Sequence, residues 1–191
     1  MPPKGIYTRK KVINAAFTII QKSRLINLTA RNVANELNSS TAPIYSYFKS
    51  MEDLTDAVLE KAKHLIMSYT TRPYSSRPFL NIGIGVLLFA RDYNNIYRDI
   101  FLEGNKFREL VQNLFSIWDK TIARDPLLDI LSKEEKRDIS DKMATFTHGI
   151  AALLCAGMIN DTRDISLRAK LEEMGNIVII HAIEKKQDKK K

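Results

Sequence analysis

Apolar residues recur at helical spacing along most of this 191-residue chain. The first stretch predicts a helix over residues 8–21, whose apolar face is formed by Val12, Ile13, Ala16, Phe17 and Ile20. A second helix is predicted over residues 30–37, with Thr29 as its N-cap. Asn38 tolerates a left-handed backbone and can end that helix.

Two further N-terminal helices follow at once. Ser40 is expected to cap a short helix over residues 41–47. Ser50 is expected to cap a longer one over residues 51–69, with Glu52 and Asp53 in its first turn, where acids favour the helix N-terminus. Short helices joined by a turn of about three residues and packed on a longer first helix make a helix-turn-helix.

The rest of the chain continues the helical periodicity, with helices predicted over residues 78–93, 94–102, 106–124, 132–158 and 166–183. Ser132 and Glu135 have the spacing of a capping box. From residue 143 onward the helix that they open is apolar on most of its circumference, so two sides must be covered. One side is the core of the chain, and the other is most simply a second subunit.

The predicted fold is therefore all-α, which agrees with only 7 Gly and 6 Pro and few alternating apolar runs. Residues 1–50 are expected to form an N-terminal helix-turn-helix domain. The helix over residues 51–69 links it to a C-terminal helical domain over residues 70–191.

The segment SSTAPIYSYF, residues 39–48, contains the third predicted helix. Pro43 fits its first turn because the missing N–H breaks no helical bond there. Ile44 and Phe48 lie four residues apart and are expected to pack on Val33 and Phe17. The side chains left facing outward are then Thr41, Ala42, Tyr45 and Tyr47, with Lys49 just beyond.

Charge is concentrated on the same part of the chain. Residues 1–50 hold eight Lys or Arg and one acid, Glu36, and so carry +7 of the total +8. Such a local excess attracts polyanions and is typical of nucleic-acid binding. The small residues Thr41, Ala42 and Pro43 suit a helix end that enters a major groove, and tyrosine hydroxyls and Lys49 suit phosphates.

Residues 8–60 resemble the DNA-binding domain of TetR/AcrR-type transcriptional repressors, most clearly in LTARNVANELNSSTAPIYSYFKSMEDLTDAVLEK. The resemblance implies that residues 41–47 form the recognition helix. It places Thr29 and Ala30 along the DNA backbone and Arg31 at a base edge or phosphate. Thr41, Ala42 and Pro43 are implied at base edges. The implied phosphate contacts are Ser40, Tyr45, Tyr47 and Lys49.

Three positions depart from the family pattern. Asn38 stands where Gly is usual, Thr41 stands where Lys, Arg or Gln is frequent, and Met51 stands where Lys is common. These departures leave the operator sequence open.

The resemblance also implies a homodimer, formed by the last two long helices, that reads palindromic double-stranded DNA. The candidate interface residues are Ala144, Ala151, Cys155, Met158, Leu171, Met174 and Val178. In the family, a small effector in the C-terminal domain releases the DNA. The candidate lining of its pocket is Phe89, Tyr93, Phe101, Phe107, Phe115, Trp118, Met143 and Phe146, unless these are ordinary core aromatics. Arg91 or His148 would supply a polar contact.

Enzymatic chemistry has no support in the sequence. His64, His148 and His181 lack metal-ligand spacing, Gly83 and Gly85 form no phosphate loop, and no cofactor or metal is implied. The lone Cys155 suits a reducing compartment. We see no secretory signal, and the longest apolar run, residues 82–90, is too short for a bilayer span. The chain is expected to be cytoplasmic and not to bind membranes.

Three hypotheses thus remain from the sequence. The first is a ligand-released dimeric repressor. The second is a helix-turn-helix regulator that is controlled by a partner protein or needs no ligand. The third is an all-α enzyme or adaptor in which the basic segment is incidental.

Overall fold

The computed structural model describes residues 7–103 and 107–188, which form helices joined by turns and loops, with no strand among them. The α-helices are α1 (Arg9–Ser23), α2 (Ala30–Glu36), α3 (Ala42–Tyr45), α4 (Met51–Thr70), α5 (Pro78–Asp92), α6 (Asn94–Tyr97), α7 (Arg108–Ile122), α8 (Lys133–Cys155) and α9 (Asp164–Asp188). Short 3-10 turns cover Leu25–Asn27 and Pro126–Leu128. The all-α prediction is confirmed.

Local capping explains where the N-terminal helices begin. The hydroxyls of Thr8 and Thr29 accept hydrogen bonds from the backbone N–H groups of Lys11 and Asn32, both at 3.2 Å. Asn38 has the expected left-handed backbone, with φ of 50°. The third helix is shorter than predicted, because only Ala42–Tyr45 is α-helical.

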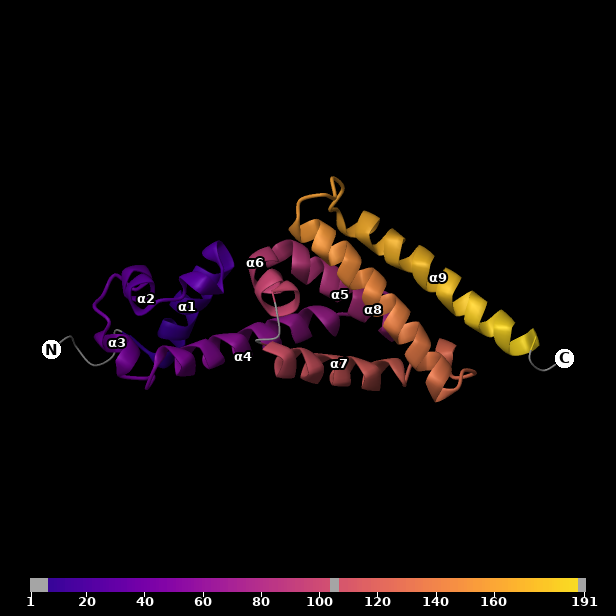
Figure 1. The fold of residues 1–191 in the computed structure, drawn as a ribbon, viewed down its shortest axis with the longest axis horizontal. Helices are drawn as coiled ribbons and strands as arrows, with labels where there is room; N and C mark the ends of the chain where they lie inside the picture. The colour runs from indigo at the N-terminus through magenta and orange to yellow at the C-terminus, as the bar shows by residue number, and fades with distance from the viewer. Residues whose placement is uncertain (1–6, 104–106, 189–191) are drawn as a thin grey trace.

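Buried apolar side chains hold α1, α2 and α3 together. As the sequence predicts, Phe17, Val33, Ile44 and Phe48 are all buried in one hydrophobic cluster. Helix α4 begins at Met51, and the hydroxyl of its N-cap, Ser50, accepts the N–H of Asp53 at 3.3 Å. It then runs from the N-terminal helices to the C-terminal bundle (Figure 1). The molecule is therefore elongated, and α4 belongs to both ends.

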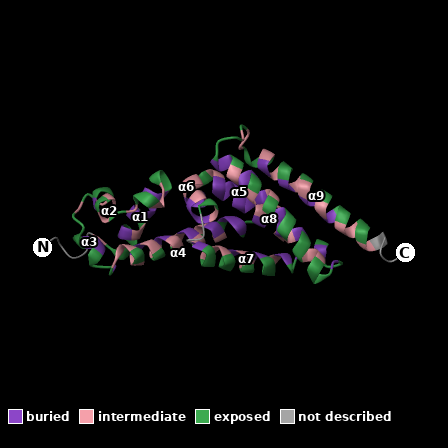
Figure 2. Ribbon diagram, in the orientation of Figure 1, coloured by how far each residue is buried: buried purple, intermediate pink, exposed green. Residues whose placement is uncertain are grey.

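Helix α5 is the centre of the C-terminal bundle and is buried along most of its length (Figure 2). Its N-terminus is capped from a distance by Asp125, which is 2% exposed and accepts the N–H of Phe79 at 3.0 Å. Gly85 allows a close crossing with α4. A Cβ added there would lie 2.4 Å from the carbonyl oxygen of Tyr69.

The region predicted as one helix over residues 94–102 is divided in the structure. Helix α6 passes at Arg98 into a π-helical segment, Arg98–Leu102. Further on, the capping box at Ser132 and Glu135 is confirmed. Helix α8 ends at Cys155 and is followed by Gly157 with φ of 71°, a conformation that favours glycine.

Candidate nucleic-acid interface and interior cavity

The surface formed by α2, α3 and their connections carries most of the residues expected to touch DNA. Thr29, Arg31, Ser40, Thr41, Ala42 and Lys49 are exposed, and Ala30 is half-buried. Tyr45 and Tyr47 are 53% and 43% exposed, which is unusual for large aromatic side chains. Neither Arg31 nor Lys49 forms an ion pair with a described residue. This surface thus offers uncompensated positive charge beside exposed hydroxyls.

Pro43 departs from the expectation. The sequence placed it at the exposed end of the third helix, but its ring is buried beside Ile44. The helix has only four residues, so its second position already faces the core that Ile44 and Phe48 complete. Pro43 therefore shapes the helix N-terminus from inside and presents no surface for a base edge.

Three hydroxyls near this surface form local hydrogen bonds. The hydroxyl of Tyr47 donates to the carbonyl oxygen of Tyr7 at 2.7 Å. The hydroxyl of Tyr7 in turn donates to the backbone carbonyl oxygen of Asn38 at 3.5 Å. A phosphate oxygen only accepts, so Tyr47 must give up this bond to contact one. Ser40 accepts the N–H of Ala42 at 3.4 Å, although Thr41 occupies the N-cap position itself.

An interior cavity lies among α5, α7, α8 and α9 and has a volume of about 50 Å³. Phe115, Trp118 and Met143, three of the candidate pocket residues, line it. So does His148, whose Nδ1 is hydrogen-bonded to the hydroxyl of Tyr97. Burial lowers the pKa of His148 to about 4, so the imidazole is neutral at physiological pH.

The other predicted pocket residues lie elsewhere. Phe89 and Tyr93 stack with ring centroids 5.4 Å apart in a cluster with Tyr69, on the side of α5 that faces α4. Phe101 packs on Tyr97. Phe107 is buried but does not line the cavity, and Phe146 lines surface grooves instead. Periodicity identified these positions as apolar but could not show which helix each one faces.

Arg91 does not reach the cavity either. Its guanidinium pairs with Asp92 at 2.7 Å and with Asp164, and it donates to the carbonyl oxygen of Thr162 at 3.1 Å. It therefore fastens the start of α9 to the end of α5. Sequence reasoning missed Arg77, which does line the cavity and donates to Asn176 at 2.9 Å. Its place just before Pro78 at a helix start was the available signal.

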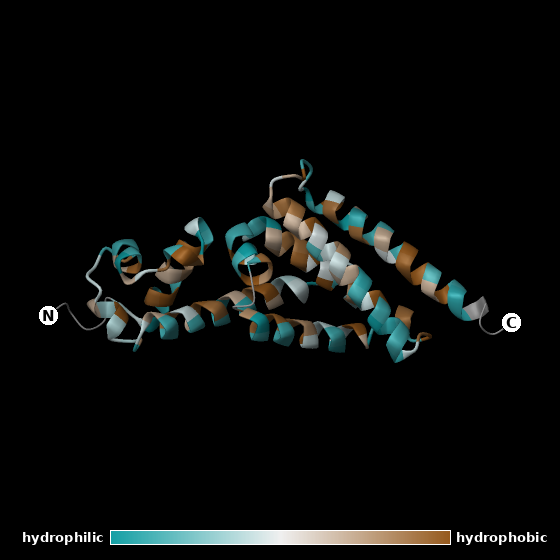
Figure 3. Ribbon diagram, viewed as in Figure 1, coloured by the Kyte–Doolittle hydropathy of each residue, from teal (hydrophilic) through white to brown (hydrophobic). Residues whose placement is uncertain are grey.

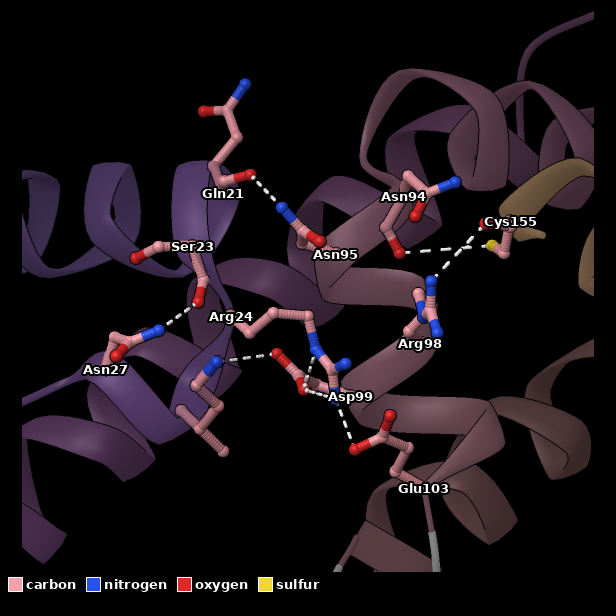
Figure 4. A network of polar contacts seen from close by, with 11 residues as sticks. Gln21, Ser23, Arg24, Asn27, Asn94, Asn95, Arg98, Asp99, Glu103 and Cys155 are labelled. Carbon is pink, nitrogen blue, oxygen red and sulfur yellow. Dashed lines mark hydrogen bonds and ion pairs between the residues drawn. The ribbon is translucent and has the colours of Figure 1, made fainter. Parts of the chain in front are cut away.

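A polar joint connects the N-terminal helices to α6 and the π-helical segment (Figure 4). The carboxylate of Asp99 accepts from Nε of Arg24 at 2.8 Å and from the N–H of Leu25 at 2.7 Å. Arg24 also pairs with Glu103, and that hydrogen bond lowers the pKa of Glu103. Asn95 donates to the carbonyl oxygen of Gln21 at 2.9 Å. The end of α1 is thus attached to the segment that carries Tyr97 and Phe101.

The residues on the outer face of α8 and α9 differ from those predicted for the subunit interface. Ala151, Cys155 and Leu171 are buried within the chain, and Ala144 is half-buried and lines the cavity, so these four do not form the outer face. They point inward because α5 packs against both helices. Met158 is 72% exposed. Two surface grooves on this face are lined in part by Phe146, Leu153, Met158, Met174, Ile177 and Val178.

Hydrophobic positions recur along the visible length of α9 (Figure 3). Ile177 and Ile180 are 56% and 54% exposed on a helix whose Leu171 and Ile179 are buried. Exposed apolar side chains grouped in this way mark an interaction surface.

Other kinds of site find little support in the described part of the chain. No group of three or more His, Cys, Asp or Glu side chains there is placed to hold a metal ion. No described helix has the length and apolar character needed to cross a bilayer.

Two solved structures share this fold. One is a TetR-like transcriptional regulator from Rhodococcus sp. RHA1, which is 16% identical, with 92% of this chain and 96% of that chain covered and a TM-score of 0.63. The other, from Rhodococcus sp., is assigned to the TetR family of transcriptional regulators. It is 15% identical, with 90% and 98% covered and a TM-score of 0.65. No protein-family model matches the chain, and no curated protein matches its sequence. The chain therefore has the TetR-like fold that its sequence led us to expect.

Proposed function

We propose that this protein is a homodimeric DNA-binding transcriptional regulator, a repressor that binds a palindromic operator and is released by a small-molecule effector. The observation that carries the proposal is the α2–α3 surface of a helix-turn-helix, where exposed tyrosines lie beside Arg31 and Lys49, which form no ion pair with any described residue. The net +7 of residues 1–50 acts in the same direction. The TetR-like fold supports this reading.

In this proposal α3 enters the major groove with its N-terminal end. Thr41 and Ala42 lie at base edges, while Pro43 supports the helix from below. Tyr45, Lys49 and Ser40 bind phosphates, and Thr29, Ala30 and Arg31 approach the DNA from the start of α2. Phosphate contacts fix the register, and base contacts determine the sequence.

The proposed dimer is formed by the outer face of α8 and α9. Phe146, Leu153, Met174 and Ile177 replace the inward-facing residues as its apolar centre, with Met158 and Val178 beside them. A two-fold dimer of this kind would present two copies of α3 to successive turns of DNA.

The proposed route from effector to DNA passes through α6. His148 in the cavity wall contacts Tyr97, and two residues later Asp99 holds Arg24 at the end of α1. A ligand that displaces His148 or Phe115 would move this segment and so reorient the N-terminal helices. The coupling is reciprocal, because DNA and ligand then each weaken the binding of the other.

The decisive experiment is selection of bound sequences from a random DNA pool with the purified protein. We expect an enriched palindrome, and an affinity for it that falls steeply with salt, because each phosphate contact releases counterions. If no sequence is enriched and no salt-dependent binding is seen, the DNA-binding proposal is wrong.

The small cavity favours a second candidate, a regulator of the same kind that responds to a partner protein or to no ligand. About 50 Å³ is well below the roughly 300–1,000 Å³ of most small-molecule sites. In that case an operator would still be enriched, but no small molecule would alter its binding.

A further inference from the structure

Polar groups are distributed unevenly around the cavity. Its wall is apolar over most of its length, with Phe79, Ile82, Val86, Trp118, Ile122 and Leu171 among the lining residues. The polar lining residues are Arg77, Asp119, Ser140, Thr147 and His148. Such a site, apolar with a few placed polar groups, fits a ligand that is mostly hydrocarbon.

The contacts of these polar residues define two ends. Ser140 and His148 are eight residues apart on α8, a distance of roughly 12 Å along a helix. The Ser140 hydroxyl donates to Asp119 at 3.4 Å, and Arg77 bonds to Asn176, which follows the lining residue Gly175. At the other end the ring of Phe115 lies 5.7 Å from that of His148.

The two ends differ in hydrogen bonding. At the His148 end the imidazole Nδ1 and the Tyr97 hydroxyl satisfy each other. At the Arg77 end the guanidinium Nε is buried and has no hydrogen-bond partner among the described residues. A buried donor without a partner is unfavourable, so this end lacks an acceptor that a ligand could supply.

We propose that the effector is an amphipathic carboxylate, whose acid group accepts from Arg77 and whose apolar chain extends towards Phe115 and His148. The inference deepens the proposed function, since it names the chemical class of the effector. Asp119 is exposed and Arg77 is half-buried, so water screens the repulsion of an anion by the Asp119 carboxylate more strongly than its attraction by the Arg77 guanidinium.

The wall can widen to admit such a chain. Gly175 presents bare backbone to the cavity from inside α9, where glycine is otherwise unfavourable. A Cβ added at Gly175 would meet only Met143 Cε, at 3.7 Å. Met143 is a flexible side chain that adapts to what packs against it. A slim, unbranched chain fits these features better than a bulky ring system.

Trp118 is the single tryptophan of the chain and lines the cavity, so its fluorescence reports occupancy without DNA. The test titrates the full-length protein with decanoate and, as the uncharged match, with 1-decanol. We expect decanoate to change the Trp118 emission with a dissociation constant at least about tenfold lower than that of decanol, because a charge-assisted hydrogen bond is added.

Arg77→Gln should remove this preference while decanol binding persists. The matched control is Arg72→Gln, since Arg72 lies in the same turn but stacks on Tyr69 at 4.4 Å outside the cavity. Arg77→Lys keeps the positive charge and should retain part of the preference for decanoate. Comparing it with Arg77→Gln separates the loss of the charged group from a loss of the fold. Thermal unfolding of each variant checks that it is folded.

Equal affinity of the wild type for decanoate and decanol, no response to either, or an unchanged decanoate affinity in Arg77→Gln would each overturn the proposal. An enriched operator without decanoate binding would leave the proposed function standing and reject only the effector class. Decanoate binding without any enriched DNA would reject the proposed function and keep the ligand site.

Discussion

Individual hydroxyls distinguish contact residues from structural ones on the α3 surface. Tyr45 is 53% exposed and its hydroxyl has no partner among the described residues, whereas the Tyr47 hydroxyl is bonded to Tyr7. Both tyrosines look alike in the sequence. Their separate roles depend on where the chain before α1 lies, which no local pattern determines.

Tyr45→Phe should weaken binding to all DNA sequences about tenfold or more, because one hydrogen bond to a charged phosphate contributes about 1.5 kcal/mol or more. Lys49→Gln should weaken binding similarly and lower the salt slope by about one. Fluorescence anisotropy at several salt concentrations measures both.

Tyr47→Phe is the matched control for Tyr45→Phe and should weaken DNA binding less. A larger effect of Tyr47→Phe would show that the Tyr47 hydroxyl leaves Tyr7 to contact DNA. Thr41→Ala should instead change sequence preference.

His148 makes stability depend on pH. Its folded pKa of about 4 lies below the unfolded value of about 6.5, so the unfolded state binds the proton more readily. This contribution is complete above pH 6.5 and is lost as the pH falls towards 4, by roughly 3 kcal/mol. Urea unfolding across this range measures it. His148→Gln should flatten that part of the profile, and identical profiles for the two proteins would contradict the assignment.

At the scale of elements, the crossing of α4 and α5 fixes the linker helix to the bundle. Gly85→Ala would place a Cβ against the backbone of Tyr69 and Thr70, which cannot yield as a side chain can. We expect a destabilisation of about 1–3 kcal/mol, seen as a lower Tm. Gly175→Ala is the control, since its Cβ makes ordinary contact at 3.7 Å and helix propensity favours alanine. Equal effects would refute the close crossing.

The joint between α1 and the π-helical segment should transmit movement. Asp99→Asn weakens the bonds to Arg24 and Leu25, and we expect operator affinity to fall about tenfold because the N-terminal helices lose a fixed orientation. Anisotropy measures the affinity, and electron spin resonance on a cysteine introduced at Ser39 measures the spacing between protomers. Asp161→Asn, which breaks the Arg163 pair within the α8–α9 connection, is the control. Unchanged affinity and spacing in Asp99→Asn would exclude a coupling role.

At the scale of the whole molecule, the apolar face of α8 and α9 decides the oligomeric state. Ile177→Glu leaves the fold of one protomer intact because Ile177 is 56% exposed, but it would bury a charge in the proposed dimer. An unpaired buried charge costs on the order of 3 kcal/mol or more, so the dimer should dissociate over 100-fold more readily. Analytical ultracentrifugation measures this. Ile26→Glu, at an 87% exposed site near α1, should have no effect.

The sequence by itself determined the features that depend on neighbours along the chain. Helix periodicity located most helices, and Thr29, Ser50 and Ser132 marked helix starts because a cap acts on an N–H only two or three residues away. The sequence also predicted the left-handed turn at Asn38 and showed the concentration of positive charge in residues 1–50. These features were sufficient to predict the fold class and the α2–α3 surface.

Only the tertiary structure decided which side of an apolar helix faces inward and which distant groups meet. Ala151 and Leu171 look like interface residues by spacing, but α5 packs against them. Arg24 and Asp99 are 75 residues apart, and nothing local pairs them. Arg77 is a candidate because it lines the cavity and its buried Nε has no hydrogen-bond partner among the described residues. The hydrophobic effect has no preferred direction. The sequence therefore shows that a side chain is buried, but only the packing of the helices decides which neighbours it contacts.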